Sequence, residues 1–173
     1  MGLDMFLTRK KYVGAEYEHR NVKGTIYITI GDKQLPIDFD RVSYIEESAG
    51  YWRKANQIHN WFVENVQDGV DNCGNYYVST EQLQELLDLC KKVKKTAKVK
   101  DGETEEDRII ENAEEVEELL PTQDGFFFGT TSYDGWYMQD IDYTIDLLKK
   151  LLKEEKELNE LGFYSDFYYR SSW

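Results

Sequence analysis

The chain is short of cysteine and of long apolar runs, and each shortage excludes a class of protein. Its 173 residues include only two cysteines, Cys73 and Cys90. Two cysteines are too few for a disulfide framework and lack the spacing of metal ligands, so we expect free thiols and a cytoplasmic location. No apolar run approaches the roughly 20 residues of a membrane helix, and we expect no secretory signal and no membrane partner.

Basic residues are also scarce relative to acidic ones. Lys and Arg number 21 against 34 Asp and Glu, which gives a net charge of −13. This balance argues against direct binding to a nucleic acid backbone, which requires clustered Lys and Arg. It leaves open plain solubility or an acidic surface that docks on a basic patch of another protein. Aromatic residues, in contrast, make up 14% of the chain and suit pockets and interfaces as well as cores.

The order of the patterns predicts an α+β fold in a single domain that spans residues 1–173. The expected arrangement is a small antiparallel sheet from the N-terminal half packed against about four helices. Strands are expected at residues 3–7, 22–30, 35–39 and 41–45, and residues 8–20 are expected to be irregular. Helices are expected at residues 49–66, from 80 onwards, at 105–119 and from about 136 to 162.

Local signals mark the ends of these elements. Ser79 and Gln82 have capping-box spacing, and Asp134 is a candidate N-cap of the last helix. Residues 96–107 are expected to form an exposed, charged connection. The tail at residues 163–173 is too aromatic for a disordered segment, so we expect it to pack on the body or on a second subunit. A homo-oligomer is therefore one of the arrangements that the sequence allows.

The helix expected at residues 49–66 carries polar side chains on its apolar face. At about 100° per residue, His59 falls near the centre of the apolar arc and Asn56 near its edge. A buried imidazole or carboxamide costs free energy unless it is hydrogen-bonded. Either the fold or a ligand must therefore satisfy these two side chains. The structural alternatives are a hydrogen-bonded core histidine at position 59 and an Asn56 that braces a loop.

Two further segments add to this set: residues 71–73 carry carboxylate and amide groups, and residues 121–136 combine aromatic rings with amide, hydroxyl and carboxylate groups. Together with the helix they predict a pocket for a flat, polar, ring-containing ligand, because rings stack on bases, Asn pairs with base edges and Arg binds phosphate. The candidate ligand-binding residues are Trp52, Arg53, Asn56, His59, Asp71, Asn72, Thr122, Phe127, Tyr133 and Trp136. An ion pair between Arg53 and Asp71 is the structural alternative for those two side chains.

Recognised catalytic patterns are missing. The chain has no phosphate-binding loop of the G-x-x-x-x-G-K-[ST] type, no G-x-G-x-x-G, no H-E-x-x-H and no G-x-S-x-G. His19 and His59 are its only histidines, so a histidine-rich metal site cannot be built. A nucleophile pair of Cys73 and His59 is conceivable, but no third orienting group can be identified. We therefore expect no catalytic residue, metal or cofactor, and we favour a non-enzymatic role.

Four segments form a characteristic set. They are Met1-Gly2-Leu3-Asp4-Met5, Tyr51-Trp52-Arg53-Lys54-Ala55-Asn56-Gln57-Ile58-His59-Asn60-Trp61-Phe62, Asp71-Asn72-Cys73-Gly74, and Leu120-Pro121-Thr122 with Gly125-Phe126-Phe127-Phe128-Gly129 and Tyr133-Asp134. As a set they resemble a family of small proteins found mainly in bacteriophages and prophages. The resemblance covers residues 1–7 and 44–150. It implies a phage origin and carries no mechanism that can be transferred.

Three functional hypotheses follow. A phage accessory protein of this size often counters a bacterial defence, so the first is a protein that binds and sequesters a small nucleotide-derived signal without catalysis. The second is an acidic inhibitor or decoy that docks on a host defence protein, motivated by the charge of −13. The third is a hydrolase that acts on such a signal with His59.

Overall fold

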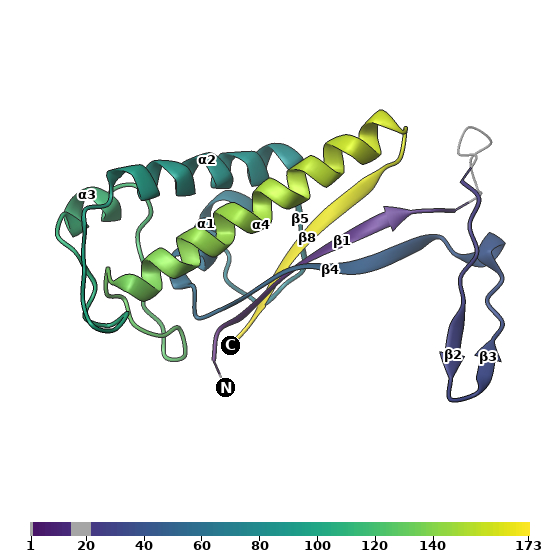
Figure 1. Ribbon diagram of the computed structural model, residues 1–173, viewed down its shortest axis with the longest axis horizontal. Coiled ribbons are helices and arrows are strands. Elements are labelled where there is room, and N and C mark those ends of the chain that lie inside the picture. Colours follow the sequence, from purple (N-terminus) through teal and green to yellow (C-terminus); the bar gives the residue numbers. More distant parts are fainter. Residues whose placement is uncertain (1, 15–21) are drawn as a thin grey trace.

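A four-stranded antiparallel sheet with helices on one of its faces forms the body of the protein (Figure 1). The structure is a computed structural model in which residues 2–14 and 22–173 are described. Residues 15–21, part of the segment expected to be irregular, lie outside the described residues, and so does His19. The sheet and its helices confirm the α+β prediction.

The strand order in this sheet is β4–β1–β8–β5, and every neighbouring pair is antiparallel. The strands are β1 (Asp4–Tyr12), β4 (Tyr44–Arg53), β5 (Tyr76–Val78) and β8 (Ser165–Ser172). The first strand is thus longer than expected, and the aromatic tail supplies an interior strand from the C-terminal end. In both strands, buried and more exposed side chains alternate, as expected for a strand with one face on the core. The buried side chains include Met5, Leu7, Phe167 and Tyr169.

The start of the helix expected at residues 49–66 is wrong. Residues 49–53 belong to β4, and α1 (Asn56–Val66) begins only after Lys54. Trp52 lies opposite Met5 in the β1–β4 ladder and is buried. The φ angle of Lys54 is +61°, a left-handed conformation at which the chain leaves the strand and turns into α1. A short apolar run such as that around Trp52 is compatible with a helix or with a strand. Here, pairing with β1 makes it a strand.

The two long helices pack against each other over the sheet (Figure 1). They are α2 (Thr80–Thr96) and α4 (Gly135–Glu160). The capping box is confirmed, since Gln82 N–H donates to Ser79 Oγ at 3.1 Å and Ser79 N–H donates to Gln82 Oε1 at 2.9 Å. The N-cap is confirmed by Tyr137 N–H, which donates to Asp134 Oδ1 at 3.1 Å. Within residues 2–14 and 22–173, no helix has the length and apolar character needed to cross a membrane.

The helix expected at residues 105–119 is wrong over most of its length. The elements found in this region are β6 (Val99–Lys100), β7 (Ile109–Ile110), which pairs with β6, and the single-turn helix α3 (Ala113–Glu117). Asn112 explains the break. Its Nδ2 donates to the Thr96 carbonyl at 3.0 Å, and Lys98 N–H donates to its Oδ1 at 2.7 Å. Side-chain bonds of this kind compete with the continuation of a helix.

A small hairpin projects away from the body, beyond the far ends of β1 and β4 (Figure 1). It consists of β2 (Ile28–Ile30) and β3 (Lys33–Leu35), and the 3-10 helix η1 (Phe39–Arg41) follows it. The strands expected at residues 22–30 and 35–39 are therefore much shorter than the sequence suggests. A two-stranded ribbon with no sheet beside it is marginal in water, so apolar alternation alone does not sustain long strands.

Candidate functional site

The buried histidine on α1 is satisfied by the fold itself. His59 is 0% exposed. Its Nδ1 lies 2.7 Å from the Tyr169 hydroxyl of β8, and its Nε2 lies 3.0 Å from Asp71 Oδ2. The other carboxylate oxygen of Asp71 accepts a hydrogen bond from Trp173 Nε1 at 3.1 Å. The chain Tyr169–His59–Asp71–Trp173 thus ties α1, the loop after it and the C-terminus together.

Burial lowers the pKa of His59, and the neighbouring Asp71 carboxylate only partly opposes this shift. A neutral imidazole with its proton on Nε2 donates to Asp71 and leaves Nδ1 to accept from the Tyr169 hydroxyl. Burial also raises the pKa of Tyr169, which keeps its hydroxyl protonated as the donor. This arrangement gives His59 a structural role and leaves no ring nitrogen for a substrate.

Asn56 braces a loop. Its Nδ2 donates to the carbonyls of Phe128 at 3.1 Å and Thr130 at 2.8 Å, and Gln123 N–H donates to its Oδ1 at 3.2 Å. The side chain is buried, and these three hydrogen bonds satisfy both its amide nitrogen and its amide oxygen within the chain. Asn56 therefore positions residues 123–130 against the start of α1.

Two more of the predicted site residues are held in local structural contacts. The indole Nε1 of Trp52 is buried and donates to Thr144 Oγ1 of α4 at 2.9 Å. Asn72 closes a tight turn, because its Oδ1 accepts from Gly74 N–H and from the Tyr76 hydroxyl, both at 2.9 Å. Both side chains therefore serve the fold.

The loop that follows Pro121 holds two further predicted residues. The Tyr133 hydroxyl accepts a hydrogen bond from Thr122 N–H at 3.3 Å and its ring packs on Tyr137. The Phe127 carbonyl accepts from Leu3 N–H at 3.0 Å, while its ring is partly exposed beside Phe126. These contacts dock the loop on the N-terminus and on the first turn of α4.

The alternative ion pair between Arg53 and Asp71 is not formed. Asp71 is engaged by His59, and Arg53 instead places its Nε 4.0 Å from Asp4 Oδ1 on the neighbouring strand. The Arg53 side chain remains 64% exposed. A loose, solvated contact of this kind contributes little to stability and leaves the guanidinium accessible to an anion.

The candidate site is a pocket of about 340 Å³ where β4, α1, the loop after Pro121 and the start of α4 meet. It is lined by Arg53, Lys54, Gln57, Glu106, Thr122, Gly129, Thr130, Ser132, Asp134, Trp136, Tyr137 and Asp140. Arg53, Thr122 and Trp136 are the three predicted site residues that it brings together. The other seven lie in the core or in the surrounding loops.

Backbone geometry at the pocket is unusual. Lys54 has a positive φ, which costs free energy for a residue with a Cβ, and Gly129 across from it has a φ of +91°. A Cβ on Gly129 would lie 3.1 Å from Lys54 Cβ. Glycine therefore lets the loop approach the strained turn closely. Strained residues of this kind concentrate at ligand sites, where the surrounding structure holds them in place.

The pocket also contains a carboxyl group with a shifted pKa. Burial raises the pKa of Asp140 from 3.8 to about 6, while a hydrogen bond from Gln57 Nε2 to Asp140 Oδ2 at 3.2 Å acts in the opposite direction. Ionisable groups with such shifts are more frequent at functional sites than elsewhere. Asp140 was not among the predicted site residues. Its spacing of four residues from Trp136 places both side chains on the same side of α4.

The described residues offer no cluster of three or more His, Cys, Asp and Glu side chains that could hold a metal ion. Comparisons with protein-family models, with curated proteins and with solved structures found no match to this chain.

Proposed function

We propose that the protein binds a small nucleotide-derived molecule in the 340 Å³ pocket and sequesters it without catalysis. One observation carries this proposal: a single pocket combines two cations, an exposed indole and a carboxyl group of raised pKa. Arg53 and Lys54 suit a phosphate, because their charges pair with anionic oxygens. Trp136 is 47% exposed and suits stacking with a base.

The acidic groups of the pocket select among anions. Glu106, Asp134 and Asp140 would repel a ligand that is only a phosphate or a carboxylate. A nucleobase carries ring and exocyclic N–H groups, and those donors match the Asp140 carboxylate and the Gln57 side-chain oxygen. A ligand with a phosphate at one end and an N–H-bearing ring at the other therefore fits both signs of charge.

The volume of the pocket limits the size of the ligand. Pockets for small molecules span about 300–1,000 Å³, and this one is near the lower limit. A mononucleotide, or one half of a cyclic dinucleotide, has a suitable size. The resemblance to phage proteins adds a biological setting to the proposal, in which the bound molecule is a nucleotide signal of a bacterial defence.

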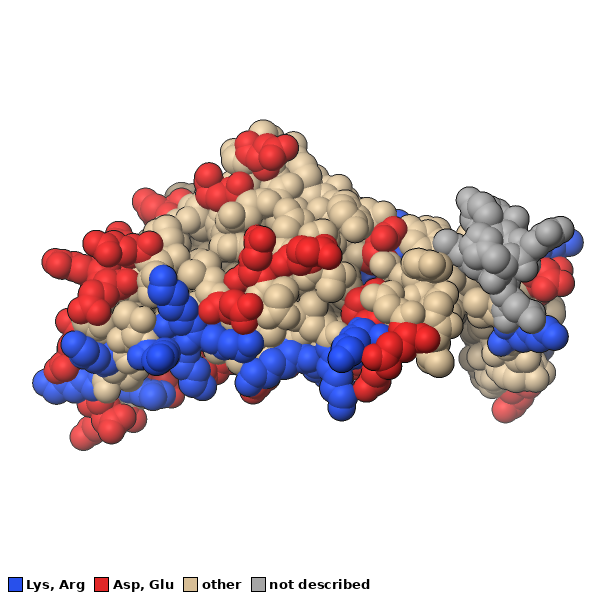
Figure 2. Space-filling view, turned by 90° about the horizontal axis from the view of Figure 1, so that it is seen from above, with Lys and Arg blue, Asp and Glu red and all other residues tan. Residues whose placement is uncertain are grey.

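The other two hypotheses receive less support. A hydrolase that uses His59 is disfavoured because this side chain is fully buried and both ring nitrogens are engaged. An acidic decoy needs a continuous acidic surface. Figure 2 shows Asp and Glu scattered over one face of the molecule, with Lys and Arg gathered along one border of the same face. The charge on that face is therefore mixed, so that face does not offer the continuous acidic surface that a decoy needs.

A ligand screen tests the proposal directly. Thermal shift against linear nucleotides, cyclic nucleotides and ADP-ribose derivatives should identify one class that stabilises the protein, by about 2.7 kcal/mol at a hundredfold excess over Kd. Calorimetry with that ligand should show at least tenfold weaker binding for Arg53→Ala and Trp136→Ala. Arg41→Ala, which removes an exposed guanidinium from the distant hairpin region, is the matched control and should bind normally.

Recovery of the ligand separates sequestration from catalysis. Chromatography after a long incubation should return the ligand chemically unchanged. Turnover would contradict the non-catalytic part of the proposal, and a screen in which no class shifts the unfolding temperature would contradict the pocket itself. Normal binding by both Arg53→Ala and Trp136→Ala would show that the ligand binds elsewhere.

A further inference from the structure

Among residues 2–14 and 22–173, helices cover one face of the sheet and no helix covers the other. In Figure 1 the helices α1, α2 and α4 all lie on one side of the four strands. The uncovered side, here called the open face, carries the outward residues of every strand. Its most prominent members are Phe6, Lys10, Tyr51, Tyr77, Tyr168 and Arg170. The pocket lies where β4 ends and α1 begins, and none of these six residues lines it.

The open face is aromatic and remains accessible. Tyr51 on the edge strand β4 is 43% exposed, and Tyr77 on the opposite edge strand β5 is 55% exposed. Cations cover the rings between them. Arg170 places its Cζ 4.3 Å from the centre of the Phe6 ring, and Lys10 Nζ lies 4.8 Å from the centres of both Tyr44 and Tyr168. Tyr and Arg are the residues that protein interfaces favour.

Charges on the open face balance although the whole protein carries −13. Its cations are Lys10, Arg170 and, at the border with the pocket, Arg53, and its anions are Asp4, Glu46 and Asp166. Several of these groups are paired within the face, Lys10 Nζ with Glu46 at 3.8 Å and the Tyr12 hydroxyl with Asp166 at 2.7 Å. The excess negative charge therefore lies on other parts of the molecule.

We propose that the open face is the contact surface between two copies of this chain. A polyanion such as single-stranded nucleic acid gains nothing from a face of zero net charge on an acidic protein. A second copy gains most there, because its own charges are neutralised at that face and the two acidic bodies point away from each other. A two-fold contact brings the same patch of both copies together, so a charge-balanced patch complements itself.

The size of the face sets the strength of the contact. With nine residues in β1, the face is about 30 Å long at about 3.4 Å per residue. The three long strands β4, β1 and β8, at about 4.8 Å each, make it about 15 Å wide, and β5 adds only three residues at one edge. Two such faces bury on the order of 900 Å² in total, which is the range of weak and reversible interfaces. The dimer is therefore expected at micromolar concentrations and not below.

Sedimentation velocity on the full chain over roughly 1–200 µM tests this inference. The wild type should pass from monomer to dimer within that range. Tyr51→Glu and Tyr77→Glu, on opposite edges of the sheet, should each weaken dimerisation at least tenfold. Leu161→Glu adds the same charge at an 82% exposed position after α4 and should leave the dimer unchanged. Circular dichroism confirms that each variant is folded.

Three results would overturn the inference. The first is a monomer at every concentration. The second is a dimer that Tyr77→Glu does not weaken. If Tyr51→Glu alone weakens it, the contact lies at the β4 edge, and if neither variant weakens it, the contact lies elsewhere. The third is binding of a fluorescent single-stranded oligonucleotide by the monomer, lost in both variants. Salt separates the cases further, because raising NaCl from about 50 to about 500 mM screens repulsion between acidic copies but weakens nucleic acid binding.

Discussion

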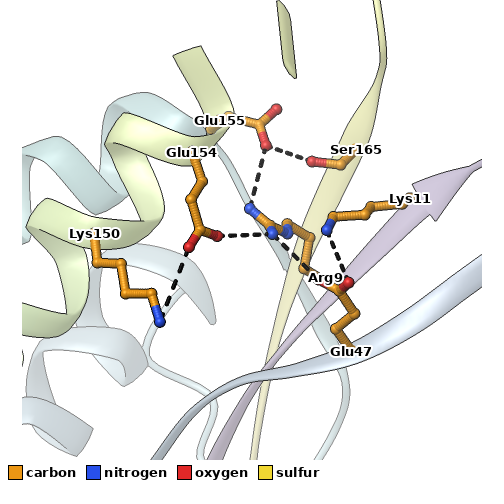
Figure 3. A network of polar contacts seen from close by, with 7 residues as sticks. All are labelled: Arg9, Lys11, Glu47, Lys150, Glu154, Glu155 and Ser165. Carbon is orange, nitrogen blue, oxygen red and sulfur yellow. Dashed lines mark hydrogen bonds and ion pairs between the residues drawn. The ribbon is translucent and has the colours of Figure 1, made fainter. Parts of the chain in front are cut away.

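Arg9 and Glu155 are both buried, and Arg9 Nη1 lies 3.9 Å from Glu155 Oε2 where α4 crosses β1 (Figure 3). Arg9 Nη2 also contacts Glu154 at 3.0 Å and Glu47 at 3.1 Å, while Ser165 donates its hydroxyl to Glu155. A buried charge loses its hydration and depends on such partners. This cluster therefore fixes the second half of α4 to the sheet.

Removing Arg9 alone should lower the free energy of unfolding more than removing both charges of the buried pair. Arg9→Met should lower the free energy of unfolding by about 3–5 kcal/mol, because Glu155 is left buried without a cation. The double variant Arg9→Met with Glu155→Gln should recover part of that loss. Glu154→Gln, at a side chain that is 37% exposed, should cost less than about 1 kcal/mol. Urea unfolding of the wild type and these variants measures each value.

An additive double variant would contradict this account. If the losses of Arg9→Met and Glu155→Gln simply sum, then Arg9 and Glu155 contribute to stability independently and the buried ion pair has no coupling energy. The slope of the unfolding free energy with urea should also stay constant across the series, since none of the variants is expected to change the surface exposed on unfolding.

The buried histidine should make the protein sensitive to acid. Burial lowers the pKa of His59 in the folded state. Below about pH 6.5, the unfolded chain therefore binds a proton at this side chain more readily than the folded chain does. Stability is therefore complete above the unfolded pKa of about 6.5 and falls as the pH drops below it. In His59→Gln, thermal unfolding followed from pH 8 to pH 5 should lose this component of the pH dependence.

The same variant separates structure from binding. His59→Gln should lower the free energy of unfolding by about 1–3 kcal/mol, because Tyr169 and Asp71 lose a well-placed partner. At a temperature where the variant is folded, the affinity for the pocket ligand should be unchanged. A loss of affinity without a loss of stability would place His59 in the ligand site and contradict the structural role.

The elements that local sequence signals define were predictable, and those that depend on distant partners were not. The capping box at Ser79 and the N-cap at Asp134 are complete within four residues of chain. The strand β8 depends on pairing with β1, about 160 residues away, so its aromatic alternation predicts only a packed tail. Long-range pairing is invisible to a local pattern.

The pocket was predicted only in part for the same reason. The polar residues on the apolar arc of α1 resemble a binding surface, but the loop they face and the C-terminal strand satisfy them. Asp140 and Gln57 each look like ordinary solvated positions in their own helices, and only the packing of α1 on α4 brings them together. Arg53, Thr122 and Trp136 were predictable because each combines a suitable side chain with a segment boundary.

Asp140 should destabilise the protein at neutral pH. Its pKa is raised from 3.8 to about 6, so the folded state binds the proton more tightly than the unfolded state. The contribution of Asp140 to the free energy of unfolding is therefore complete below about pH 4 and is lost as the pH rises through about 6. This trend is opposite to that of His59. Asp140→Asn keeps an oxygen for Gln57 and should raise the free energy of unfolding at pH 7 by on the order of 2 kcal/mol.

The gain in stability should be accompanied by a loss of binding. The carboxamide of the Asp140→Asn variant presents no charge to the N–H edge of a base, so affinity at pH 7 should fall at least tenfold. Below about pH 5 the wild-type side chain is protonated and the two proteins should bind alike. Calorimetry at both pH values checks this, and a variant that binds as well as wild type at pH 7 would remove Asp140 from the site.

The strained turn at Lys54 should show the same trade between stability and binding. Glycine adopts a φ of +61° without the penalty that a Cβ imposes, so Lys54→Gly should raise the free energy of unfolding by up to about 1 kcal/mol. It also removes one of the two pocket cations and should weaken ligand binding. Lys54→Ala keeps the strain but removes the charge, so it should weaken binding equally without the gain in stability. Thermal unfolding and calorimetry on both variants distinguish backbone strain from charge, and equal stability of the two would show that the left-handed turn stores no strain.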